Sequence, residues 1–193
     1  MAQIVAIFLH FKEPEKTLKI RNVREELIDK TLPWGFFDGA SQDQRLHCGG
    51  GGVLYKSNSH YFHFSVGLGR GTNNYDELMT LRLLLLFTLE QGCMSLQVYG
   101  DSLLVIEWAK ELIQCHVVLL LPILEEVLLI KHQFNYISFT HFFRERNGVA
   151  DQLSKEASQR HIDFGLCKIT EHSRVGSSSY YHRPFFEPVL LQH

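Results

Sequence analysis

The chain has 193 residues, of which 45% are apolar and 21% are charged, and its formal net charge is -2. This length is enough for one domain with a buried core. The slightly negative charge excludes a globally basic protein that binds nucleic acid without specificity, so any nucleic-acid site should be local. The four cysteines are scattered, which argues against a disulfide framework and a structural zinc site. No stretch approaches the roughly 18 uninterrupted apolar residues of a membrane span.

The first 32 residues form a charged lead-in, and Pro33 marks the entry to a new segment. Three strands are predicted after it, at 34–38, 49–55 and 61–66, because aromatic and β-branched residues there are separated by turn residues. Strands that follow one another so closely are expected to pair as antiparallel neighbours.

The pattern then changes from the period of strands to that of helices. Asn74 and Glu77 have the spacing of a capping box, and they open a predicted helix that Gly92 closes. Further strands are predicted at 96–99 and 134–143, and further helices at 101–112, 123–132 and 147–157, the last capped by Asn147. The order β-β-β-α-β-α-α-β-α predicts an α/β fold with a mixed sheet and helices packed on it. Residues 161–193, with a Gly-Ser-Ser-Ser run and two prolines, are expected to form a loosely structured C-terminal extension.

Four acidic residues stand at the ends of these elements: Asp38, Glu77, Asp101 and Asp151. Taken singly, each has a structural explanation, as a turn residue, a capping-box partner, an N-cap or a residue that complements a helix dipole. Taken together, they lie where strands end and helices begin, which is where sites form in open α/β sheets. Carboxylates that converge there repel one another unless cations lie between them.

Divalent cations that prefer oxygen ligands match such a set. We expect two Mg²⁺ ions, with Mn²⁺ able to replace them, because the set has no cysteine and no obligatory histidine. Two such ions, about 3.5–4 Å apart, can activate a water and stabilise the leaving oxygen during phosphodiester hydrolysis.

Five segments carry a family resemblance: FFDGAS (36–41), GGGGVLY (49–55), GLGRGTNNYDEL (67–78), VYGDSLLVIEW (98–108) and FFRERNGVADQLSKEA (142–157). In this order they resemble the ribonuclease H family, and in particular the ribonuclease H domain of plant non-LTR retroelement reverse transcriptases. The resemblance implies a ribonuclease H-like domain at 33–160, between the lead-in (1–32) and the extension (161–193). It implies a five-stranded mixed sheet of order 3-2-1-4-5, and magnesium binding by the four acids.

The resemblance also implies functional residues beside the acids. Asparagines that contact RNA in type 1 enzymes fall on this chain's Asn73 and Asn147, and such groups distinguish RNA by its 2′-OH or base edges. His141 falls where type 1 enzymes carry a histidine that assists product release. The expected nucleic-acid contacts are Asn73, Asn74, Asn147, Arg144 and Arg146.

The chain departs from the family pattern in three places. Leu103 replaces a glutamine that touches the substrate, and Asp76 stands where the plant pattern has alanine. Residues 112–121 are apolar where bacterial members carry a basic protrusion. These departures concern substrate affinity more than chemistry, and the basic residues of the lead-in, between Lys12 and Lys30, are a possible substitute arm.

The expected function is that of a metal-dependent endonuclease that hydrolyses the RNA strand of RNA–DNA hybrids. We expect an intracellular location, in the nucleus or cytoplasm, and the domain could belong to a larger reverse transcriptase polyprotein. The alternative is a nucleic-acid-binding module that keeps the ribonuclease H fold with weak or no activity. The complete acid set argues against that alternative, whereas the missing basic surface favours it. A proofreading-type exonuclease is disfavoured, because such enzymes carry Asp-x-Glu on the first strand, where this chain has Asp38-Gly39-Ala40.

Overall fold

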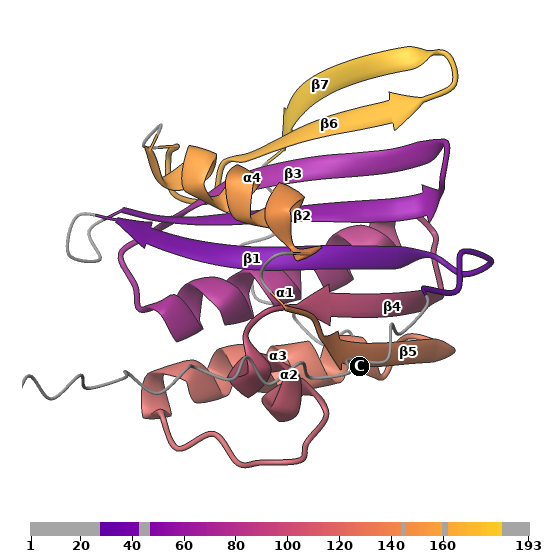
Figure 1. The fold of residues 1–193 in the computed structure, drawn as a ribbon. Helices are drawn as coiled ribbons and strands as arrows, with labels where there is room; N and C mark the ends of the chain where they lie inside the picture. The colour runs from indigo at the N-terminus through magenta and orange to yellow at the C-terminus, as the bar shows by residue number, and fades with distance from the viewer. Residues whose placement is uncertain (1–27, 43–46, 144–145, 160–161, 183–193) are drawn as a thin grey trace, which may run out of the picture.

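A seven-stranded sheet with helices on both faces forms the core of the protein (Figure 1). The computed structural model describes residues 28–42, 47–143, 146–159 and 162–182. The elements are β1 Trp34–Gln42, β2 His47–Ser57, β3 His60–Gly69, α1 Asn73–Glu90, β4 Ser95–Gly100, α2 Leu103–Ala109, η2 Val118–Leu120, α3 Leu121–Lys131, β5 Tyr136–His141, α4 Gly148–Gln159, β6 Cys167–Ser173 and β7 Gly176–His182. The strand order is β5-β4-β1-β2-β3-β6-β7, so the first five strands confirm the predicted order 3-2-1-4-5.

The sheet is mixed, and this arrangement places the strand ends that matter for function. β1 pairs antiparallel with β2 and parallel with β4, while β4 pairs parallel with β5. Helix α1 packs on one face with α2 and α3 beyond it, and α4 crosses β1, β2 and β3 on the other face (Figure 1). Because β1 and β4 run in the same direction, their carboxyl ends open toward the same edge.

Helix α1 is buried almost all round because it lies between the sheet and α3. Leu78, Leu81 and Leu85 are fully buried. Its N-cap is Thr72, whose hydroxyl accepts a hydrogen bond from the Tyr75 N–H at 3.2 Å. The predicted capping box of Asn74 and Glu77 is therefore wrong, and Glu77 is free for another role.

The glycines of β1 and β2 let both helices lie close to the sheet. A Cβ on Gly39 would lie 2.5 Å from the backbone nitrogen of Glu77 in α1. A Cβ on Gly51 would lie 2.3 Å from the backbone nitrogen of Ser154 in α4. Side chains at these positions would push the two helices away from the sheet, and with them the acids they carry.

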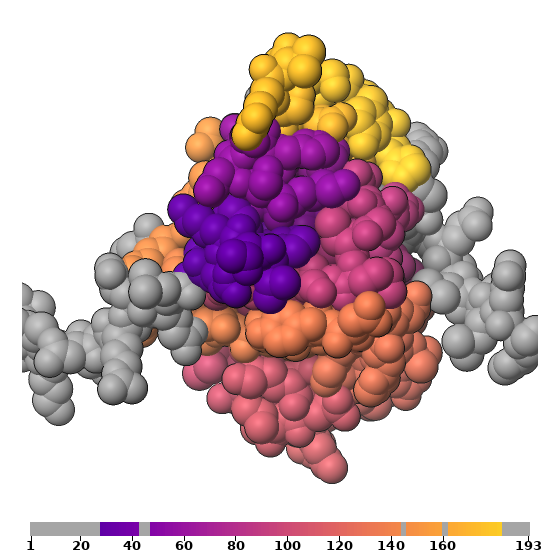
Figure 2. Space-filling view, turned by 90° about the vertical axis from the view of Figure 1, so that its right-hand side faces the viewer, coloured from indigo at the N-terminus to yellow at the C-terminus, as the bar shows by residue number. Residues whose placement is uncertain are grey.

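The sheet has two strands more than the five that we predicted. β6 pairs antiparallel with β3, and β7 pairs antiparallel with β6. The expectation of a loosely structured extension is therefore wrong for residues 167–182. The reason is burial: Cys167 and Ile169 are 1% and 0% exposed and join the main core. The hairpin of β6 and β7 forms one end of the molecule in Figure 2, in yellow.

The opposite end of the molecule in Figure 2, in salmon, belongs to the region of α2 and α3. The helix predicted at 101–112 is shorter, since α2 ends at Ala109. Beyond it Leu112, Val118 and Leu119 are exposed at 64%, 75% and 84%. No helix within the described residues is long and apolar enough to cross a membrane. All four cysteines are buried, and none of them forms a disulfide.

Candidate metal centre

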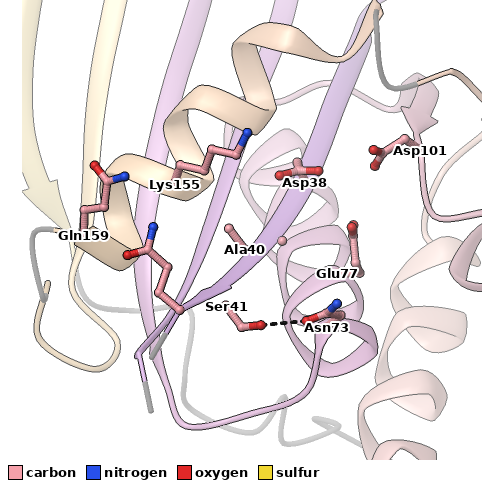
Figure 3. A pocket seen from close by; sticks show the side chains of 10 residues that line it. Asp38, Ala40, Ser41, Asn73, Glu77, Asp101, Lys155 and Gln159 are labelled. Carbon is pink, nitrogen blue, oxygen red and sulfur yellow. Dashed lines mark hydrogen bonds between the residues drawn. The ribbon is translucent and has the colours of Figure 1, made fainter. Parts of the chain in front are cut away.

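Three of the four predicted acids converge where the parallel pairing of β1 with β4 ends. Asp38 lies on β1, Glu77 in the first turns of α1, and Asp101 directly after β4 (Figure 3). One carboxylate oxygen from each lies within 4.8 Å of the others. This separation is too short for three mutually repelling charges in a protein interior, but it suits oxygen ligands around a divalent cation.

The sheet register accounts for the meeting of Asp38 and Asp101. Phe37 is aligned with Gly100 across the parallel pair of β1 and β4. Asp38 and Asp101 are the next residues of the two segments, so they lie side by side. Side chains alternate along β1, which sends Phe37 into the core and Asp38 toward α4. Glu77 reaches the same place from α1, because Gly39 allows the helix to approach β1.

Burial and mutual repulsion shift the protonation of two of these groups. Asp38 is 2% exposed, and its pKa is raised to about 7 by desolvation, although a hydrogen bond from the Ser154 hydroxyl lowers it in part. The charges of Asp101 and Asp151 raise it further. The pKa of Glu77 is raised well above its ordinary value, mainly by burial and then by Asp38 and Asp101.

The donor set fits a hard divalent cation. All three groups offer carboxylate oxygens, and Oε2 of Glu77 is buried with no hydrogen-bond partner among the described residues. A buried polar atom without a partner is costly unless something else satisfies it. A cation at this point would satisfy Oε2 and would lower the pKa of each carboxyl group around it.

Asp151, the fourth predicted acid, stands apart from this group of three. It lies in the first turn of α4, and its Oδ2 forms an ion pair with Lys155 Nζ at 2.5 Å, one helical turn later. Its charge still raises the pKa of Asp38, so it lies near the cluster electrostatically. Lys155 thus neutralises Asp151 at the position where the sequence predicted a metal ligand.

Asn147 and His141 both contact Asp101. The Asn147 side chain does not cap α4 as predicted: its Nδ2 donates to the carbonyl oxygen of Phe37 at 2.9 Å and to Oδ1 of Asp101 at 3.5 Å. It is 1% exposed, so in this structure it positions Asp101 and does not face solvent. His141, at the end of β5, has Nε2 3.0 Å from the carbonyl oxygen of Asp101, beside the cluster.

The cluster opens into a cavity of about 420 Å³ between β1, α1 and α4 (Figure 3). Asn73 lines it and accepts a hydrogen bond from the Ser41 hydroxyl at 2.6 Å. Lys155 and Gln159 line the wall formed by α4. Asn74 is half-buried next to Asn73.

Of the two predicted arginine contacts, the structure describes Arg146, which lies two residues before α4. Arg146 is exposed, with its guanidinium 5.6 Å from the ring centre of Phe142, and Arg144 lies outside the described residues. Sequence reasoning missed Ser154 and the polar residues that line the cavity. Ser154 could have been found by its spacing, because it follows Asp151 by three positions and so lies on the same helix face.

Several solved structures that are similar to this chain are ribonucleases H. RNase H1 of the halophilic archaeon Halobacterium salinarum NRC-1 is 26% identical with a TM-score of 0.63, over 66% of this chain and 98% of that one. The N-terminal RNase H domain of a Mycobacterium tuberculosis protein is 25% identical with a TM-score of 0.62, over 67% and 94%. LC11-RNase H1, solved with an RNA/DNA hybrid, is 23% identical with a TM-score of 0.58, over 66% and 97%, and shows the likeness of fold alone.

The fold and the acid cluster therefore define a ribonuclease H-like protein. Residues 36–157 match the family described as reverse transcriptase-like, and the chain belongs to this family. A search among curated proteins finds no match.

Proposed function

We propose that the protein is a metal-dependent endonuclease that hydrolyses the RNA strand of RNA–DNA hybrids. The observation that carries the proposal is the convergence of Asp38, Glu77 and Asp101, whose oxygens lie within 4.8 Å of one another around the unsatisfied Oε2 of Glu77. The fold supports the same activity, because solved structures like this one are ribonucleases H.

Asp38, Glu77 and Asp101 would hold divalent cations, two Mg²⁺ ions or Mn²⁺ in their place, with Asp151 as a further ligand. When bound, the ions supply an activated water and stabilise the leaving oxygen. Asn147 holds the carboxylate of Asp101 in place. The ion pair with Lys155 occupies Oδ2 of Asp151 and competes with a cation for this carboxylate; when the pair opens, the Lys155 ammonium can contact a substrate phosphate.

Recognition of RNA would come from the rim of the cavity. Asn73 is exposed there at the start of α1, and its amide can bond a 2′-hydroxyl or a base edge. Asn74 and Arg146 are further contacts in this proposal, and Arg146 is exposed. His141 would assist release of the product from beside Asp101.

The decisive experiment is cleavage of a hybrid with end-labelled RNA, in Mg²⁺, Mn²⁺ or EDTA. We expect cuts in the RNA strand alone, with 3′-hydroxyl and 5′-phosphate ends, and no cuts in EDTA. Asp101→Asn should lose activity by orders of magnitude while the matched exposed substitution Asp163→Asn keeps it. Equal activity of the two variants would exclude Asp101 as a ligand.

A second candidate function is that of a hybrid-binding module without activity, and the Lys155–Asp151 ion pair is the observation that favours it. A lysine that permanently occupies Asp151 would leave one ligand fewer for cations. The same assay separates the two functions, since this module would bind the intact hybrid in Mg²⁺ and leave the RNA uncut.

A further inference from the structure

A second cavity, of about 220 Å³, lies on the other side of α4 from Lys155. Its floor is the face of β3 and β6 that α4 leaves open, with His63, Ser65, Lys168 and His172. Its wall is α4, through Leu153 and Glu156 among others. Because Asp151 and Lys155 project from the opposite side of the same helix, the two cavities are separated by about one helix diameter, roughly 10–12 Å.

Aromatic rings form a row across the sheet that ends in this cavity. The ring centres of His63 and His172 lie 4.7 Å apart, and Tyr61 stacks on His172 at 4.7 Å with the planes 15° apart. The row continues through Tyr55, 5.1 Å from Tyr61, to Trp34, which stacks on Tyr55 at 4.9 Å. These distances match the spacing of neighbouring strands, so the row presents ring faces and edges along one side of the sheet.

Several polar groups of the cavity have no partner within the described part of the chain. Nε2 of His172 is buried without a hydrogen-bond partner. No hydrogen bond or ion pair is described for the Ser65 hydroxyl or the Lys168 ammonium in those same ranges. Burial and the neighbouring His172 lower the pKa of His63, so its imidazole is neutral at pH 7 and can both donate and accept. Uncommitted polar groups that converge on a concave site are typical of a binding pocket.

We propose that this cavity binds one unpaired base of a nucleic-acid strand. The inference rests on the proposed function, because the metal centre would hold the hybrid. The unpaired base would belong to a single-stranded extension of that hybrid. The base would stack on the ring of His172 and contact the ring of His63, whose plane is tilted by 59° to it, while Ser65 would bond the edge of the base and Lys168 a phosphate. Aromatic side chains beside a cationic group are the usual means of holding single strands.

The size and the lining both favour a base over other ligands. Pockets for drug-sized ligands are about 300–1,000 Å³, so a smaller cavity suits a single planar ring system. An apolar side chain from a protein partner would leave Lys168, Ser65 and Nε2 of His172 buried and unpaired, which is costly. A bare phosphate would bond Lys168 but would make no use of the stacked rings.

The test compares fluorescently labelled hybrids in EDTA, so that no strand is cut, by anisotropy. The first hybrid has blunt ends. The second carries five single-stranded nucleotides at each end of its DNA strand, and the third carries the same extensions with abasic sugars. We expect the base-containing extension to bind at least about fivefold tighter than the abasic one, the lower end of the effect of stacking one base. Equal affinities for the two extensions would overturn the proposal.

Variants assign the effect to the cavity. His172→Ala should abolish the preference for bases, and His172→Phe should retain it, because phenylalanine keeps the stacking face. His60→Ala is the matched control, since His60 lies on β3, the strand paired with β6, and bonds Glu171 on the opposite face of the sheet. Lys168→Gln should weaken both extensions equally. A loss in His60→Ala as large as in His172→Ala would overturn the assignment.

Failure of this inference and failure of the proposed function have different signatures. A protein that cuts hybrids but ignores the extension retains its function and refutes the base site. A protein that never cuts RNA yet distinguishes base from abasic extensions retains the base site and refutes the nuclease.

Discussion

Replacing Asp76 with asparagine should stabilise the protein, and the gain should grow as the pH rises. Asp76 lies in α1, is 0% exposed, and neither of its carboxylate oxygens has a hydrogen-bond partner of ordinary geometry among the described residues. Burial raises its pKa from 3.8 to about 7, and the nearby thiol of Cys48, a weak donor, offsets this only in part. The charged form is therefore disfavoured in the folded state.

The magnitude follows from linkage between protonation and folding. The unfolded chain releases the Asp76 proton near pH 3.8, whereas the folded protein holds it until about pH 7. Stability is therefore lost as the pH rises between these values, and above pH 7 the loss is constant. At about 1.4 kcal/mol per pH unit, the full penalty is about 4 kcal/mol, and about 3 kcal/mol of it develops between pH 5 and pH 7. Asparagine has no proton to lose, so Asp76→Asn should escape this loss.

The measurement is urea unfolding of wild type and variant at half-unit steps from pH 5 to pH 9, in EDTA and in Mg²⁺. The difference in free energy of unfolding should increase by about 3 kcal/mol up to pH 7 and then level off. Asp163→Asn makes the same chemical change at an exposed position and controls for the general effect of charge. A difference between Asp76→Asn and wild type that stays constant with pH would refute the reasoning, because it would mean that Asp76 is not forced to ionise inside the fold.

Three further predictions concern the metal centre and the lead-in. Asp38→Asn should raise the free energy of unfolding in EDTA, and the gain should grow from about pH 4 to pH 7 because the pKa of Asp38 is raised to about 7. Mg²⁺ should raise the melting temperature of the wild type more than that of the variant. A wild-type melting temperature insensitive to Mg²⁺ would contradict this. Lys155→Met should tighten Mg²⁺ binding by about two- to fivefold in calorimetry, since it removes an exposed ion pair that competes for Asp151; unchanged affinity would show that the pair opens at no cost. Removing residues 1–27 should weaken hybrid binding and make its salt dependence shallower, if the basic lead-in contacts phosphate, and an unchanged salt slope would show that it does not.

The sequence by itself determined the order of the elements from β1 to α4 and the identity of the three acids that converge. Alternating and helical patterns report which face of a strand or helix is buried, and parallel strands bring their carboxyl ends to one edge. Asp38 and Asp101 could therefore be placed together, and the structure confirms that they meet, although β1 continues past Asp38 to Gln42. The domain limits of 33–160 stay a prediction. The roles of the other site residues stay predictions as well.

Contacts across the sheet were decided by tertiary structure alone. A pattern states that Asn147 begins a helix, but not that its amide turns back to Phe37 and Asp101. The strand β7 was missed because it is Ser-rich, is exposed at every residue before His182, and has no apolar alternation to reveal it. His63 and His172 are in contact because β6 pairs with β3 in one particular register. Asp151 forms an ion pair with Lys155 and does not lie among the other acids. Such contacts depend on which strand or helix packs beside each residue, and the local sequence does not specify that neighbour.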